Sequence, residues 1–96
     1  MADKNVCSSS WQGKAGETIT LKNDNGNPVT VSPCTPAPPD WPFSNPSSAF
    51  GVPAKVGSTP GTMQVTLKST PGSYGYNTKG CPGDPKDVNP KTVIIT

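Results

Sequence analysis

Residues 17–32, ETITLKNDNGNPVTVS, contain two short stretches in which polar and apolar side chains alternate. Residues 17–22 and 28–32 follow this period of two, which is typical of strands with one buried face. The run between them includes Asn25-Gly26, a pair that favours the positive φ angles of a tight turn. We therefore expect a β-hairpin whose inward side chains are those of Ile19, Leu21, Val29 and Val31.

Further short strands are expected along the rest of the chain, over residues 52–56, 63–68, 73–77 and 92–96. The side chains predicted to point inward there are those of Met63, Val65, Leu67, Val93 and Ile95. Residues 33–51 contain six prolines and predict a long loop, because proline cannot donate to a sheet ladder. Residues 80–90 predict a second loop. The sequence thus indicates one all-β domain over residues 1–96, a sandwich of six to eight strands.

The amino-acid composition indicates the cellular compartment and limits the classes of possible partner. Three cysteines in 96 residues indicate an oxidising compartment, where a disulfide supplements a small core. We expect a periplasmic or extracellular protein whose leader has been removed, with Met1 added for expression. No apolar run approaches the ~18 residues of a membrane span. Eight scattered lysines without a single arginine argue against nucleic acid as a partner.

The absence of histidine limits the chemistry that the chain can perform. Serine and cysteine nucleophiles usually rely on histidine as their base. The six acidic residues include no close pair suited to glycoside hydrolysis. Residues 23–27 are only superficially similar to a calcium loop, since Leu21 would occupy the first ligand position. We therefore expect no catalytic residues, no cofactor and no metal, and a protein that is not an enzyme.

Residues 16–23, GETITLKN, followed by PVTV at 28–31, resemble the second and third strands of the cupredoxin family. Residues 71–76, PGSYGY, resemble the strand that leads into its metal loop, and residues 92–96 fit its last strand. The resemblance covers residues 15–32 and 63–96. It implies a Greek-key β-sandwich.

The resemblance also identifies what this chain lacks. Cupredoxins bind copper through two histidines, one cysteine and usually one methionine. The two histidine positions fall at Val29 and Cys81, the cysteine position at Thr78, and the methionine position near Lys86. A blue-copper site needs imidazole and thiolate together, and this chain offers no imidazole. The resemblance therefore implies a cupredoxin-like fold without copper.

The family topology places three loops at one end of the sandwich, and these correspond here to residues 7–13, 33–51 and 78–90. All three cysteines, both tryptophans and Phe43 would gather at that end. On this analogy we expect a disulfide between Cys34 and Cys81, which would tie the two long loops together. The alternatives are Cys7 with Cys34 and Cys7 with Cys81.

Two functions are consistent with these residues. The first is a non-catalytic exported binding or structural module. Its surface, formed by Trp41, Phe43 and Trp11 beside the proline-rich loop, would contact a protein or other surface ligand. The same aromatic side chains could instead plug the sandwich, which we expect for Trp11 and leave open for Trp41. The second function is a soft-metal carrier that holds Cu(I) through the thiolates of Cys7, Cys34 and Cys81.

Overall fold

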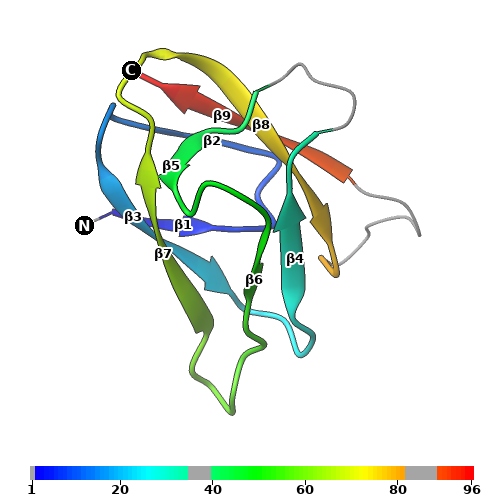
Figure 1. Cartoon of the computed structure of the whole chain (residues 1–96). Helices are drawn as coiled ribbons and strands as arrows, with labels where there is room; N and C mark the ends of the chain where they lie inside the picture. Colours follow the sequence, from blue (N-terminus) through cyan, green and yellow to red (C-terminus); the bar gives the residue numbers. More distant parts are fainter. Residues whose placement is uncertain (1, 35–39, 82–88) are drawn as a thin grey trace.

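In the computed structural model, which describes residues 2–34, 40–81 and 89–96, two β-sheets pack against each other (Figure 1). The four-stranded sheet has the order β1-β3-β7-β5, and the five-stranded sheet has the order β2-β9-β8-β4-β6. The strands are β1 (Ala2–Asn5), β2 (Ser10–Gly13), β3 (Thr18–Asn23), β4 (Val29–Ser32), β5 (Phe43–Asn45), β6 (Phe50–Val52), β7 (Gly61–Leu67), β8 (Gly72–Lys79) and β9 (Asn89–Ile95). The predicted all-β sandwich is confirmed, although the described residues form nine strands rather than six to eight.

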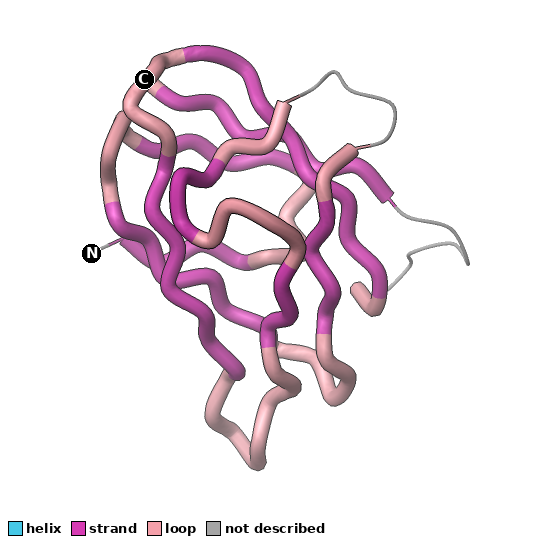
Figure 2. Tube along the Cα trace, in the orientation of Figure 1, coloured by secondary structure: helices cyan, strands magenta, loops and turns pink. Residues whose placement is uncertain are grey.

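Consecutive strands lie in opposite sheets at every step from β1 to β8, and β8 and β9 alone are sequential neighbours within a sheet. Figure 2 traces these crossings as loops between the two layers. The part of the chain shown there in colour contains no helix that could span a membrane. The hairpin predicted for residues 17–32 is therefore wrong. β3 pairs with β1 and β7, whereas β4 pairs with β6 and β8.

The connection from β3 to β4 is organised by Asn23 rather than by the Asn-Gly pair. Asn23 is fully buried. Its Nδ2 donates hydrogen bonds to the carbonyl oxygens of Asn27 at 2.8 Å and Pro53 at 3.1 Å, and its Oδ1 accepts one from the Asn25 amide at 2.9 Å. Gly26 is not among the described glycines with a positive φ angle. The Asn23 side chain thus satisfies backbone groups where the chain leaves one sheet and enters the other.

The core lies between the sheets and contains most of the side chains that were predicted to point inward. Ile19, Leu21, Val29 and Val31 are fully buried. Val65, Leu67, Val93 and Ile95 are at most 2% exposed, and Met63 is partly buried against them. The predicted strand at 52–56 is wrong beyond Val52, because β6 ends there and the side chain of Val56 is 79% exposed.

Both open sides of the sandwich are closed by segments that change sheets. Residues 2–13 supply β1 to one sheet and β2 to the other, and residues 43–52 supply β5 and β6 in the same way. These four edge strands contain only three or four residues each. Short edges expose few unpaired backbone groups, which limits edge-to-edge association. β5 also shows that the predicted loop at 33–51 contains a strand.

Candidate functional site

The structure pairs Cys7 with Cys81 and leaves Cys34 as a free thiol. The predicted pairing of Cys34 with Cys81 is wrong, and the alternative of Cys7 with Cys81 is the one observed. Strand direction explains the difference. β4 runs antiparallel to β8 with Ser32 opposite Asn77, so Cys34 lies further back along β8, away from Cys81. Cys7 follows β1 at the end of the sandwich where β8 finishes, and its Cα lies 5.6 Å from that of Cys81.

Cys34 is half-buried beside β8. Its Sγ donates a hydrogen bond to Oδ1 of Asn77 at 3.5 Å. Burial raises the pKa of the Cys34 thiol above its usual value. The thiolate is the nucleophilic and metal-binding form of cysteine, so a raised pKa makes Cys34 a weaker nucleophile and metal ligand near neutral pH.

The positions that the resemblance assigns to copper do not fit that ion. Val29 is fully buried and carries no donor atom, and Thr78 is fully buried and offers a hydroxyl group. Cys81 is bonded to Cys7, and Lys86 lies outside the described residues. A three-thiolate Cu(I) site also lacks its donors in this form, because two of the three sulfurs are joined to each other.

The aromatic residues predicted to form a binding surface lie mainly in the core. Trp11 is 8% exposed on β2 and Phe43 is 1% exposed on β5, so neither offers a free face to a ligand. Their ring centroids are 6.3 Å apart. Trp41 is half-buried, with its ring edge-on to Phe43 at 5.2 Å and its Nε1 donating to the carbonyl oxygen of Pro46 at 2.9 Å. The expectation that Trp11 plugs the sandwich is therefore confirmed, and the predicted surface is wrong for Phe43.

A buried hydrogen-bonded chain explains why Trp11 belongs inside. Its Nε1 donates to Oη of Tyr76 at 2.8 Å, and Tyr76 Oη donates to the carbonyl oxygen of Val6 at 3.1 Å. These two hydrogen bonds connect β2, β8 and the segment between β1 and β2. Burial raises the pKa of Tyr76 to about 12, against a smaller lowering by the hydrogen bond from Trp11. Tyr76 is thus held in its neutral form inside the fold.

This raised pKa predicts a loss of stability in alkaline solution. Between the usual pKa of 10.0 and about 12, the unfolded chain has lost the Tyr76 proton while the folded protein keeps it. Since the unfolded state binds fewer protons there, the free energy of unfolding falls as pH rises, by roughly 1 kcal/mol for each pH unit. Denaturant unfolding at about pH 9 and about pH 11 measures the fall.

Tyr76→Phe serves as the control for this alkaline loss, because it lacks the titrating hydroxyl and keeps the ring. All other ionisable groups stay the same, so the variant should be less stable at about pH 9 but should lose less between about pH 9 and pH 11. Equal falls in the two proteins would contradict the assignment to Tyr76.

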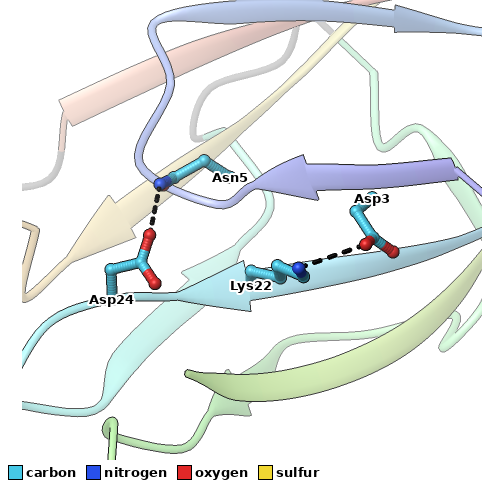
Figure 3. Close-up of polar contacts among 4 residues, drawn as sticks. All are labelled: Asp3, Asn5, Lys22 and Asp24. Carbon is cyan, nitrogen blue, oxygen red and sulfur yellow. Dashed lines mark hydrogen bonds and ion pairs between the residues drawn. The ribbon is translucent and has the colours of Figure 1, made fainter. Parts of the chain in front are cut away.

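An open cavity of about 330 Å³ lies against the disulfide and is lined by Asn5, Cys7, Ser8 and Asn25. Asn25 Nδ2 donates to Sγ of Cys7 at 3.3 Å, and Asn5 Oδ1 accepts a hydrogen bond from the Cys7 amide at 2.9 Å. Asn5 Nδ2 donates to Oδ2 of Asp24 at 3.4 Å, and an ion pair of 3.1 Å joins Lys22 to Asp3. Figure 3 shows the two contacts next to each other. The half-exposed ion pair contributes little stability. The cavity offers neutral hydrogen-bonding groups beside a sulfur atom.

No pattern in the sequence indicates this cavity. Asn5 and Asn25 are twenty positions apart, and only the crossings between the sheets bring them together. The signal that the sequence offers is the concentration of asparagine in residues 23–27, which also predicts a tight turn. No family model, curated protein or solved structure matches the chain. Its function is therefore inferred from these residues.

Proposed function

We propose that this protein is a non-catalytic, exported binding or structural module with a cupredoxin-like fold and no blue-copper site. The observation that carries the proposal is the chemistry at the positions assigned to the metal. Val29 and Thr78 are buried in the sandwich, and Cys81 forms a disulfide with Cys7. A covalent cross-link thus lies where the resemblance implies a metal ion.

Close packing between β4 and β8 supports this view. Gly80 has a φ angle of 111°, and a Cβ atom added to it would lie 2.5 Å from the carbonyl oxygen of Pro28. The same atom would lie 3.5 Å from Cα of Val29. Thr30 pairs directly with Lys79. The backbone at Gly80 therefore lies directly against that of Pro28 and Val29, and Val29 is one of the positions that the resemblance assigns to the metal.

Export is supported by the disulfide, because such bonds persist in oxidising compartments and are rare where thiols are kept reduced. The aromatic surface available for binding is smaller than the sequence predicts. Of the three aromatic residues first assigned to the surface, Trp41 alone remains partly exposed, beside the half-buried Pro46 and Phe50. A protein or other surface ligand at this part of the molecule would contact Trp41.

The proposal predicts one free thiol and no bound metal. Alkylation of the native protein without reductant should add a single group, at Cys34, and elemental analysis should find no copper or zinc. Addition of Cu(II) should not produce the intense thiolate-to-copper absorption of a blue-copper site. Reduction before alkylation is the control and should give three modified cysteines.

Three modified cysteines without reduction, together with bound copper, would instead support the soft-metal carrier. That function needs the sulfurs of Cys7 and Cys81 as thiolates, which the disulfide does not provide. The same experiment therefore separates the two functions.

A further inference from the structure

The two cysteine residues of the disulfide differ in their exposure to solvent. Cys81 is 5% exposed and belongs to the hydrophobic core, whereas Cys7 is half-buried. Of the two, Cys7 alone lines the cavity of about 330 Å³. A nucleophile that approaches the folded protein at this site therefore reaches Cys7 before Cys81.

The cavity has the polarity of a site for a small polar molecule. The carboxamide groups of Asn5 and Asn25 and the hydroxyl group of Ser8 supply both donors and acceptors. The hydrogen bonds from Asn25 Nδ2 to Cys7 Sγ and from the Cys7 amide to Asn5 Oδ1 hold the sulfur at the cavity wall. A small thiol that carries amide or hydroxyl groups matches this lining.

We propose that Sγ of Cys7 is the atom that small polar thiols attack in thiol–disulfide exchange with this protein. The thiolate sulfur of the small molecule forms a bond with Sγ of Cys7 as the Cys7–Cys81 bond breaks. The electron pair of the broken bond leaves with Sγ of Cys81, which then takes a proton from water. The products are a mixed disulfide on Cys7 and a reduced Cys81.

Two further features support a selective reaction. The exchange needs contact between the attacking sulfur and the attacked one, and burial of Cys81 denies that contact. The protein's own free thiol does not compete, because Cys34 is hydrogen-bonded to Asn77, further back along β8.

Glutathione is a suitable probe because its thiol is attached to a polar peptide. Native protein is treated briefly with glutathione, quenched with acid, blocked with N-ethylmaleimide and mapped by peptide mass spectrometry. We expect glutathione on Cys7 and maleimide on Cys81 in at least about tenfold excess over the opposite product. In denaturant both sulfurs are accessible, so the two products should form in comparable amounts. A native ratio equal to the denatured one, a preference for Cys81, or no reaction of the folded protein overturns the proposal.

A pair of neighbouring variants tests the cavity as the route of entry. Ser8→Trp fills the cavity, whereas Ser9→Trp adds the same side chain at an exposed position outside its lining. We expect Ser8→Trp to slow the modification of Cys7 by at least about fivefold and Ser9→Trp to leave the rate unchanged. Thermal unfolding of both variants establishes that they fold. Equal rates of Cys7 modification in the two folded variants would contradict the proposal that thiols reach Cys7 through this cavity.

Discussion

Replacing both Cys7 and Cys81 by alanine is expected to lower the free energy of unfolding by about 4 kcal/mol. The bond links residues separated by 74 positions, so it restricts the unfolded chain strongly. It also joins the segment that changes sheets between β1 and β2 to the residue beyond the end of β8. Small proteins have only ~5–15 kcal/mol of stability in total. Loss of this one bond should therefore bring the protein close to unfolding at moderate temperature.

Denaturant unfolding of the double variant beside Cys34→Ala measures this effect. Cys34 is the free thiol, so its replacement removes one weak hydrogen bond to Asn77 and should cost less than about 1 kcal/mol. A reductant should lower the stability of the wild-type protein by the amount that the double variant loses, and should leave the double variant unchanged. A loss in Cys34→Ala that equals that of the double variant would contradict the Cys7–Cys81 pairing.

Local properties of the fold could be predicted from the sequence, and the reason is physical. Burial of one strand face needs only alternation along the strand, so Ile19, Leu21, Val29 and Val31 were placed inward correctly. Alternation does not specify whether the next strand lies beside the first or in the opposite sheet. β3 and β4 therefore have the expected faces but no hydrogen bonds to each other.

Proline content does not exclude strands from residues 33–51. Prolines suppress central strands, but they are tolerated next to short edge strands, where few ladder hydrogen bonds are needed. Phe43 begins such an edge strand directly after Pro42, and it pairs with Leu67. Phe43, which the proline content places in a loop, is therefore a core residue that is only 1% exposed.

The candidate site could not be predicted because it depends on which strands lie next to each other. Whether Cys81 faces Cys7 or Cys34 follows from the direction of β4 along β8, a relation between distant parts of the chain. The cavity beside Cys7 likewise combines Asn5, at the end of β1, with Asn25, in the crossing from β3 to β4. Neither relation leaves a periodic pattern in the sequence.

Phe43→Ala is expected to lower the free energy of unfolding by about 3–5 kcal/mol. The Phe43 side chain is 1% exposed and lies at the centre of an aromatic cluster that joins the two sheets. Its ring centroid lies 5.2–6.3 Å from those of four other residues, Trp11, Trp41, Phe50 and Tyr76. These four rings come from three strands of the five-stranded sheet and from the connection before β5. Because each is fixed by its own strand or loop, they cannot close together over the space that the phenyl group leaves.

Trp41→Ala is the matched comparison, since it removes a larger aromatic side chain from the half-buried rim of the same cluster. We expect it to cost about 1–3 kcal/mol, less than Phe43→Ala, when both are measured by denaturant unfolding. A larger loss in Trp41→Ala would contradict this order and would place the centre of the cluster at Trp41. If Trp41 contacts a partner, part of its side chain lies outside the core. Its removal should then destabilise the fold less than the removal of the buried Phe43 does. The order of the two losses therefore tests the structural account of the core and the remaining candidate for a binding surface together.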